Sequence, residues 1–294
     1  MSGSRFWART ASLLAAVVCV AAGATPAHAG TPPDSCGRWS RQVYAITTSG
    51  GLTAETICLD PAMAVQQWTH TQVIATSGWS DTYAAVWSGE QYGSGRLYYR
   101  VSASTGALYW SRDLTTWKDV GQSVGNWRRF TSIISPAAGV LDVLDDQGSV
   151  FQLTESDWVN GSDVWTETRL TSTFGADQLV GADGESPFLG MVRGATARLV
   201  GLAADGTAGP LQISVPQGLA PAQVAPFSFA RFRTAAMAIT LTGRLALLLP
   251  IDCSGDHRIW AVKTSTGAQY AKLFLGEYLP VPGEGPVEWQ CDRS

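Results

Sequence analysis

The stretch Arg96-Leu-Tyr-Tyr-Arg-Val-Ser-Ala-Ser-Thr-Gly-Ala107 recurs in this chain and decides its fold class. It returns as Arg258-Ile-Trp-Ala-Val-Lys-Thr-Ser-Thr-Gly-Ala268 and, more loosely, as Gln42-Val-Tyr-Ala-Ile-Thr-Thr-Ser-Gly-Gly51. Aligned on the turn, one position holds Tyr44, Tyr99 and Trp260, and a second holds Ile46, Val101 and Val262. Each copy is therefore predicted to be an aromatic and β-branched strand that ends in a glycine turn.

The spacing of these copies predicts a repeat architecture. Tyr44 precedes Tyr99 by 55 residues, and Tyr99 precedes Trp260 by 161 residues, close to three further steps of about 54. Gly and Pro interrupt the chain about every ten residues, and the runs between them are rich in β-branched and aromatic residues without a helical period. We therefore expect an all-β fold of many short antiparallel strands.

Residues 130–170 can be divided into a complete unit of four strands, 130–135, 140–144, 149–154 and 165–170. The preceding unit gives strands at 82–88, 96–103, 107–111 and 116–120. Two later units fit 188–192, 197–203, 210–215 and 224–230, and then 235–241, 244–250, 257–263 and 268–275. Four-stranded units at near-constant spacing predict a β-propeller of five blades, with six blades, a sandwich or an open solenoid as alternatives.

The first unit supplies only three good strands, at 42–48, 52–59 and 68–76. We expect the C-terminal segment around Val287-Glu-Trp289 to complete it. Pairing of the two chain ends would close the ring and remove exposed sheet edges.

The first 29 residues are predicted to be a secretory signal peptide. Arg5 and Arg9 precede an apolar run from Leu13 to Ala22, and Ala27-His28-Ala29 has the small residues of a cleavage site. The remaining residues, 30–294, form one predicted propeller domain that is secreted. They carry 18 basic and 24 acidic residues, a net charge of −6. This charge argues against a nucleic-acid partner, and no remaining apolar run has the roughly 20 residues needed to span a membrane.

Four cysteines remain after cleavage, namely Cys36, Cys58, Cys253 and Cys291. An even number in an exported chain predicts two disulfides, and three pairings are possible. Sequence proximity alone favours Cys36 with Cys58 and Cys253 with Cys291. A zinc site is the weaker interpretation, because no two cysteines have ligand-like spacing and only two histidines remain. We expect no metal and no other cofactor.

The segment Ser111-Arg-Asp-Leu-Thr-Thr-Trp117 lies between the third and fourth strands of its unit. It resembles the Asp-box of sialidases, one residue shorter, and the similar turn of arabinanase-type five-bladed glycoside hydrolases. In those families the Asp and Ser side chains accept backbone hydrogen bonds while the Trp packs under the turn. The resemblance therefore implies propeller architecture and a structural role for Asp113 and Trp117.

A glycosidase would need two or three carboxylates that converge on one pocket. Asp81, Asp177 and Glu185 stand at or just before expected innermost strands, but they share no motif. Other acids stand beside glycine in expected turns, namely Asp145, Asp146, Asp183 and Asp205. We therefore name no catalytic residue, and a propeller glycoside hydrolase is kept as an alternative.

Gly125, Trp127 and Phe130, followed by Gly139, Leu141 and Val143, resemble one repeat of the tachylectin-type five-bladed lectins. Gly78-Trp79 with Tyr83 is a weaker second copy. The resemblance implies sugar sites between neighbouring blades at Asn126 and Trp127, and less directly at Trp79. An aromatic ring can stack on a sugar while amides and carboxylates bind its hydroxyls. The alternative is that both tryptophans are packing wedges between blades.

Together these observations predict a secreted, monomeric, non-catalytic lectin-like propeller whose partner is a glycan or a cell-surface polysaccharide. A secreted glycoside hydrolase and a propeller that binds protein without sugar are the alternatives, because a repeat scaffold alone does not fix function.

Overall fold

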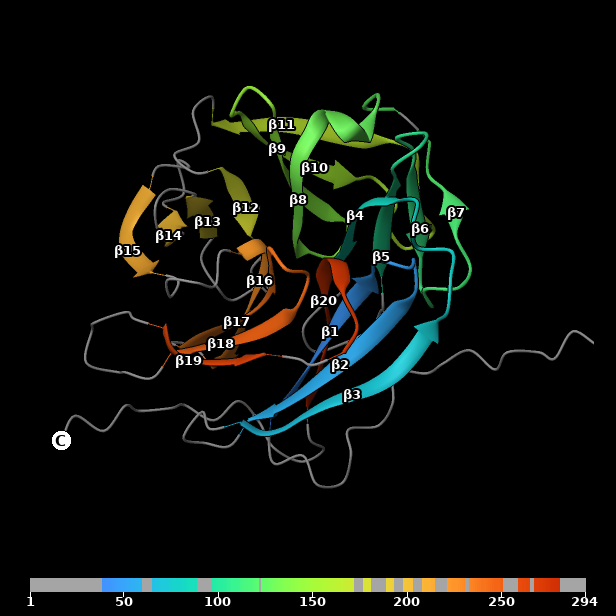
Figure 1. Ribbon diagram of the computed structural model, residues 1–294. Coiled ribbons are helices and arrows are strands. Elements are labelled where there is room, and N and C mark those ends of the chain that lie inside the picture. Colours follow the sequence, from blue (N-terminus) through green and yellow to red (C-terminus); the bar gives the residue numbers. More distant parts are fainter. Residues whose placement is uncertain are drawn as a thin grey trace, which may run out of the picture.

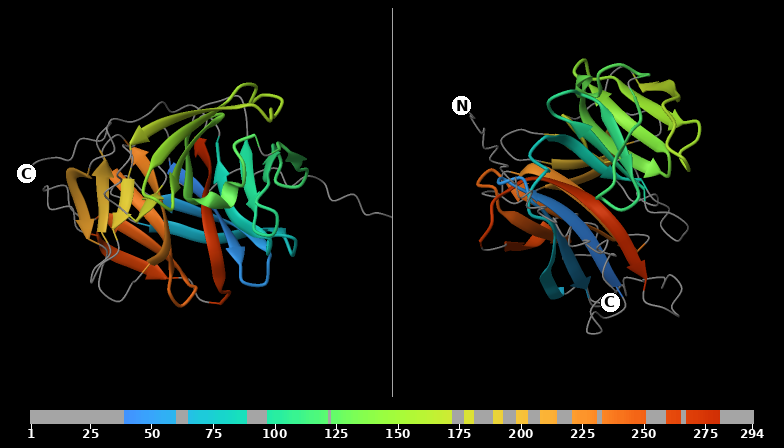
Figure 2. Two further views of the ribbon diagram at one scale, coloured as in Figure 1. Left: turned by 90° about the horizontal axis from the view of Figure 1, so that it is seen from above. Right: turned by 90° about the vertical axis from the view of Figure 1, so that its right-hand side faces the viewer.

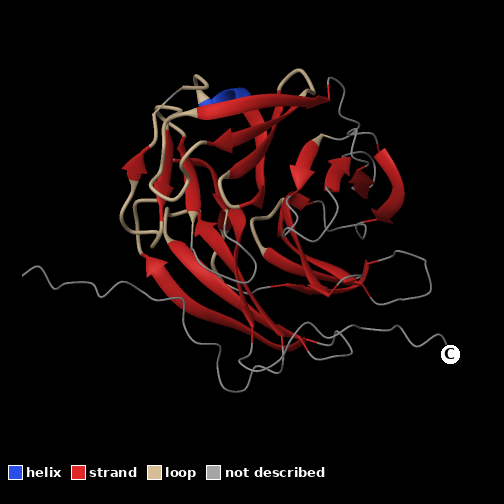
Figure 3. Ribbon diagram, turned by 180° about the vertical axis from the view of Figure 1, so that it is seen from behind, coloured by secondary structure: helices blue, strands red, loops and turns tan. Residues whose placement is uncertain are grey.

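In the computed structural model, the described residues form five antiparallel sheets of four strands each (Figure 1). These residues are 39–59, 65–88, 97–121, 123–171, 177–180, 189–192, 198–202, 208–214, 221–230, 233–250, 259–264 and 267–280. Within these ranges the helical structure is a single 3₁₀ turn, Trp127–Arg129 (Figure 3). None of the described residues forms a helix long and apolar enough to cross a membrane.

Sheets 1 to 3 are numbered here in ring order, with their strands from inside to outside. Sheet 1 contains β20 (Tyr270–Pro280), β1 (Trp39–Thr47), β2 (Leu52–Leu59) and β3 (Val65–Ala75). Sheet 2 contains β4 (Thr82–Trp87), β5 (Tyr98–Ser102), β6 (Leu108–Ser111) and β7 (Lys118–Asp119). Sheet 3 contains β8 (Phe130–Ala137), β9 (Val140–Asp145), β10 (Val150–Glu155) and β11 (Trp165–Thr171).

The remaining described strands form sheets 4 and 5. Sheet 4 contains β12 (Gln178–Val180), β13 (Leu189–Val192), β14 (Arg198–Leu202) and β15 (Ala208–Ser214). Sheet 5 contains β16 (Pro221–Ala230), β17 (Arg233–Thr240), β18 (Leu245–Pro250) and β19 (Ile259–Thr264). Contacts between first strands run from β4 to β8, then to β12, β16 and β20, and back to β4. The described strands therefore form a closed ring, which confirms the predicted all-β propeller.

The ring closes through sheet 1, where β20 pairs with β1 from Thr47 opposite Tyr270 to Trp39 opposite Pro280 (Figure 2). The prediction that a C-terminal strand completes the first sheet is confirmed, but the expected segment was wrong. It is residues 270–280, whereas 287–289 lie outside the described residues. The error arose one sheet earlier, because residues 224–230 belong to β16, the first strand of sheet 5. Each later strand therefore lies one position further out in its sheet than predicted, and the last strand, β20, becomes the first strand of sheet 1.

The three similar stretches of sequence, at 42–51, 96–107 and 258–268, are therefore not all structurally equivalent. The copy at 258–268 contains β19, the outermost strand of sheet 5, whereas β1 and β5 are second strands of their sheets. The structurally equivalent turns follow the second strand and contain Gly50, Gly106, Gly148 and Gly243, with φ between +71° and +83°. In each turn the glycine N–H donates to the carbonyl that ends the strand, namely that of Thr47, Ser102, Asp145 and Thr240. Glycine adopts this left-handed conformation without the steric cost of a Cβ.

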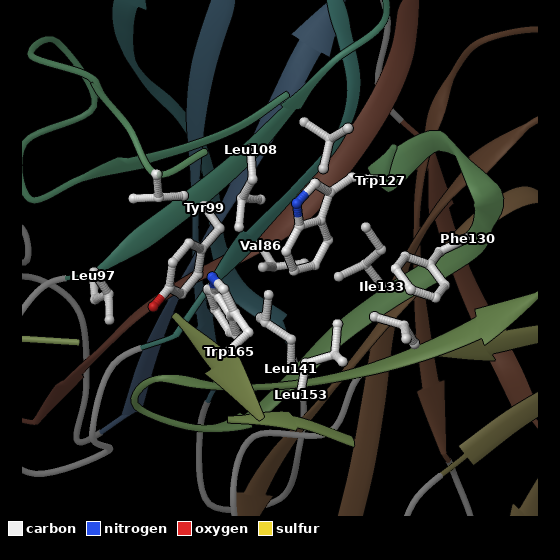
Figure 4. Close-up of a cluster of buried hydrophobic side chains, with 13 residues drawn as sticks. Val86, Leu97, Tyr99, Leu108, Trp127, Phe130, Ile133, Leu141, Leu153 and Trp165 are labelled. Carbon is white, nitrogen blue, oxygen red and sulfur yellow. The ribbon is translucent and has the colours of Figure 1, made fainter. Parts of the chain in front are cut away.

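Aromatic side chains fill the spaces between consecutive sheets. Between sheets 2 and 3, Trp127, Tyr99 and Trp165 pack with Leu and Val side chains (Figure 4). Between sheets 1 and 2 a second cluster contains Tyr44, Tyr98, Trp79 and Phe274. Burial of these large apolar rings stabilises the described core.

Candidate binding site between sheets 1 and 2

Trp79 and Trp127 each precede the first strand of a sheet and link it to the sheet before. The Trp79 N–H donates to Gly50 O at 2.9 Å, and the Trp127 N–H donates to Gly106 O at 3.0 Å. The Tyr270 N–H makes the same bond to Gly243 O at 2.7 Å. The aromatic residue and the turn glycine thus join neighbouring sheets through their backbones at three of the connections.

The indole rings of these two residues are almost completely buried, with exposed fractions of 3% for Trp79 and 1% for Trp127. Trp127 lies edge-to-face against Trp165, with ring centroids 5.3 Å apart. Trp79 stacks on Phe274 at 6.0 Å and meets Trp117 edge-on at 5.6 Å. The rings fill the spaces between sheets as the packing alternative expects, and sugar binding by them stays a prediction.

Asn126 is exposed and caps the 3₁₀ turn. Its Oδ1 accepts a hydrogen bond from Arg128 N at 2.9 Å. The same side chain lies against Gly106, where an added Cβ would stand 1.9 Å from Asn126 Oδ1. This geometry gives Asn126 a local structural role at the connection between sheets 2 and 3.

The cysteines and the possible metal ligands lie mostly beyond what the structure describes. Cys36, Cys253 and Cys291, together with the side chain of Cys58, are outside the described residues. Both disulfides therefore stay predictions. Within the described ranges, no three His, Cys, Asp or Glu side chains come close enough to hold a metal ion.

The Asp-box turn has the geometry that its sequence predicts. Asp113 Oδ1 accepts from Thr115 N at 2.8 Å and Thr116 N at 2.6 Å, and Ser111 Oγ accepts from Leu114 N at 3.0 Å. Burial opposes ionisation of Asp113, but these backbone hydrogen bonds prevail and lower its pKa to about 2. Asp113 Oδ1 is therefore engaged by the backbone of its own turn.

The acids expected near the innermost strands have structural partners where they are described. Asp81 directly precedes β4, and its carboxylate accepts from Ser102 Oγ at 2.7 Å and Ser104 N at 2.7 Å. The Ser102 hydrogen bond is the main cause that lowers the pKa of Asp81. Asp177 directly precedes β12, and Glu185 lies outside the described residues.

Arg100 is the most unusual polar side chain between sheets 1 and 2. It lies on β5, and its Cζ is 5.1 Å from the ring centroid of Trp79 and 5.8 Å from that of Trp117. These are cation–π distances, so two indole rings fix the guanidinium in place. Its buried Nε has no hydrogen-bond acceptor among the described residues. Burial lowers the pKa of Arg100 below its ordinary value.

Aromatic rings around Arg100 reach the solvent. The register places Arg100 between Ala85 on β4 and Tyr109 on β6. Tyr109, Trp117 and Arg100 itself are each partly exposed. A partly exposed indole and phenol beside a fixed guanidinium can contact the apolar face of a sugar and donate hydrogen bonds to its oxygens. We call Arg100, Trp79, Tyr109 and Trp117 the Arg100 site.

A second cation, Lys272, faces the same interface from the innermost strand β20. Its Nζ lies 5.7 Å from the ring centroid of Tyr83 on β4. The neighbouring residue on the same face of the strand, Phe274, belongs to the cluster between sheets 1 and 2. Burial lowers the pKa of Lys272, and no carboxylate of the described residues forms an ion pair with it. Among the described residues, neither Arg100 nor Lys272 therefore forms an ion pair with a carboxylate.

The loop between β10 and β11 forms a different surface, between sheets 2 and 3. Four consecutive carbonyls of this loop accept side-chain hydrogen bonds from sheet 2. Trp110 Nε1 donates to Trp158 O, Arg112 to Val159 O, and Lys118 Nζ to Asn160 O and Gly161 O, at 2.7–3.1 Å. The loop is thereby fixed while Val159 and Val164 stay exposed, at 51% and 58%.

Sequence reasoning missed Arg100 and Lys272, although one signal for Arg100 was present. It interrupts an otherwise apolar and aromatic strand, Leu97-Tyr-Tyr-Arg-Val101. A cation at such a position needs a partner or a special environment. Lys272 offered no comparable signal, because its strand was assigned to the outside of the last unit.

Comparisons with known proteins define no family for this chain. No family model matches it, and no curated protein matches it. Several solved structures are similar at low identity. A nidogen/laminin complex matches at 12% identity with a TM-score of 0.41, covering 79% of this chain and 80% of that chain.

Two further structures are similar at the same level. An engineered GH43 glycoside hydrolase with endo-xylanase and exo-arabinofuranosidase activity matches at 13% identity and a TM-score of 0.42, covering 63% of this chain and 41% of that chain. An Aleuria aurantia lectin variant in complex with Fucalpha1-6GlcNAc matches at 10% identity and a TM-score of 0.36, covering 83% and 81%. Likeness at this level carries no argument about ligand or activity.

Proposed function

We propose that this protein is an exported propeller that binds a glycan without cleaving it, and that the glycan binds at the Arg100 site. The observation that carries the proposal is a guanidinium at cation–π distance from two indole rings, one of which, Trp117, is partly exposed together with Tyr109. Sugar sites combine an aromatic face with a few fixed polar donors, and this arrangement has both. The sequence resemblance to tachylectin-type lectins also implies sites between neighbouring sheets.

Two of the described acids, Asp81 and Asp113, support binding without turnover. A glycosidase needs one carboxyl held protonated and a second that is ionised, both facing the same sugar. Asp81 and Asp113 instead accept backbone and hydroxyl hydrogen bonds that hold their own turns. Neither carboxylate is thereby left to act as a general acid.

The test compares two half-buried tryptophans from different interfaces. Trp117→Ala removes a ring of the Arg100 site, and Trp158→Ala removes one from the loop between sheets 2 and 3. We expect wild type to retain a glycan on an array with millimolar to micromolar affinity. Trp117→Ala should weaken this binding at least 10-fold, while Trp158→Ala leaves it unchanged. Melting curves of each variant show whether the fold is kept.

Three outcomes would contradict the proposal. Loss of binding only in Trp158→Ala would move the site to the other interface. Release of sugar from arabinan, xylan or sialosides by the wild-type protein would make it an enzyme. Retention of no glycan at all would remove the lectin function.

The fixed loop between β10 and β11 favours a second candidate function, the binding of another protein. Four hydrogen bonds from side chains of sheet 2 to its carbonyls hold exposed Val159 in place before any partner arrives, and exposed Val164 is held by bonds to Ser156 and Ser162. Such preorganisation lowers the entropy cost of association. A Val159→Asp variant that loses a protein partner while glycan binding persists would assign this function to the loop.

Export and disulfide formation belong to the same proposal. The apolar run after Arg5 and Arg9 predicts cleavage near Gly30, and four cysteines then remain in an oxidising environment. N-terminal sequencing of the secreted chain and mass mapping of its non-reduced peptides check both points. Four free thiols would contradict the disulfides.

A further inference from the structure

We propose that the ligand of the Arg100 site is an acidic glycan, whose carboxylate or sulfate pairs with Arg100. This inference rests on the proposed function and names the class of sugar that the same site takes. It follows from the charges between sheets 1 and 2 and from how those charges are partnered.

Arg100 lacks an anionic partner among the described residues. Its Nε is buried without an acceptor among the described residues, so an external anion would meet the terminal nitrogens, which make no hydrogen bond to a described residue. Its other contacts are the rings of Trp79 and Trp117. A half-buried cation loses hydration, and this cost is recovered when an anion accepts its hydrogen bonds. A planar guanidinium matches the two oxygens of a carboxylate or sulfate in a bidentate arrangement.

The carboxylate of Asp81 could pair with Arg100, but it already accepts other hydrogen bonds. The negative charge of Asp81 acts to raise the pKa of Arg100, but the two side chains form no ion pair. Both Asp81 oxygens instead accept hydrogen bonds, Oδ1 from Ser104 N and Oδ2 from the Ser102 and Ser104 hydroxyls. The Arg100 guanidinium therefore remains available to an external anion.

Lys272 adds an independent observation on the same interface. Its ammonium contacts the Tyr83 ring and has no carboxylate partner among the described residues. The Tyr83 hydroxyl is itself held by sheet 3, because it donates to Phe130 O at 2.9 Å. Lys272 shares a face of β20 with Phe274, and its partner Tyr83 packs against the cluster between sheets 2 and 3. The Lys272 charge raises the positive potential at the inner edge of the interface between sheets 1 and 2, which favours an anionic ligand over a neutral one.

The experiment compares each acidic oligosaccharide with the same oligosaccharide after its charge is removed. The probes are trimers of galacturonate, glucuronate and mannuronate, the methyl ester of each trimer, and a sulfated galactose oligomer with its desulfated form. Affinities of the purified chain are measured by calorimetric titration. We expect at least one acidic probe to bind 10-fold or more tightly than its neutral form, and the two anion types distinguish a carboxylate from a sulfate.

Two arginine variants assign the preference to the site. Arg100→Gln should abolish the preference for the acidic probe, and Arg100→Lys should retain part of it because the charge remains. Arg128→Gln makes the same charge change at an exposed arginine and should leave the preference intact. Melting curves test whether Arg100→Gln folds, and Arg100→Lys provides a second variant if it does not.

The possible failures are distinguishable. Equal affinity for acidic and neutral probes, or a preference that persists in Arg100→Gln, would overturn the inference while glycan binding stands. Binding of no probe or arrayed glycan, charged or neutral, would overturn the proposed function and the inference together.

Discussion

At the scale of single residues, the described polar side chains divide into those that hold the fold and those that the fold leaves without a partner. Asp113 belongs to the first group, and its role could be predicted because its partners, Thr115 and Thr116, lie within three residues. Arg100 belongs to the second group. Its environment is made by Trp79 and Trp117, which come from different connections, so its strand alone could not reveal it.

Asp142 gives a prediction on pH dependence. It is fully buried on β9, Gln152 Nε2 donates to its Oδ1 at 3.2 Å, and burial raises its pKa from 3.8 to about 6. Between these two pH values the folded state binds more protons than the unfolded state, so stability is lost as the pH rises. The loss is complete above about pH 6 and has an order of magnitude of ~3 kcal/mol.

Asp142→Asn should therefore remove this loss. We expect the free energy of unfolding of the variant to exceed that of wild type at pH 7 and to approach or fall below it at pH 4. Urea titrations at several pH values between 4 and 7 measure the difference. Asp146→Asn, on an exposed turn of the same sheet, is the control. A wild-type profile that rises through this window, with the variant parallel to it, would contradict the assignment.

At the scale of elements, the repeated unit is a turn after the second strand together with the aromatic residue that opens the next sheet. Strands 82–87 and 130–137 were predicted nearly to their ends, because β-branched residues and glycine turns are local signals. The very short β12 gave no such signal, and strand assignments from there to the C-terminus were displaced.

Gly106 tests this element. An added Cβ at Gly106 would stand 1.9 Å from Asn126 Oδ1, whereas at Gly148, in the equivalent turn of sheet 3, it would meet nothing within 4 Å. Both glycines have positive φ, at +71° and +79°, which costs an alanine roughly 1–2 kcal/mol. Gly148→Ala should therefore lose about that amount in the free energy of unfolding, and Gly106→Ala clearly more.

A double-mutant cycle separates the two costs. In an Asn126→Ala background, Gly106→Ala should cost no more than Gly148→Ala does, because the clashing side chain is gone. Chemical denaturation of the four proteins of the cycle gives the coupling energy. A coupling energy near zero would show that Asn126 does not fix the turn against the next sheet.

At the scale of the whole molecule, the ring depends on one strand from the end of the described chain. A chain that ends at Gln269 lacks β20, leaves β1 with an open edge and uncovers Tyr44, which stacks on Phe274 at 5.1 Å. We expect this truncation to lose cooperative thermal unfolding, whereas a chain that ends at Pro280 keeps it. Both are measured in reducing buffer, so that the cysteines do not contribute. Similar melting of the two truncations would contradict closure by β20.

The pairing of β20 with β1 also sets the order in which this molecule can assemble. Every other strand pairing of the described residues joins neighbours in sequence, so these hairpins can form as the chain leaves the ribosome. Sheet 1 must wait for the last described strand, and its pairing has the largest sequence separation among the described strands. The described strands thus stay an open arc until residues 270–280 have been made, which suits the export proposed above for this protein.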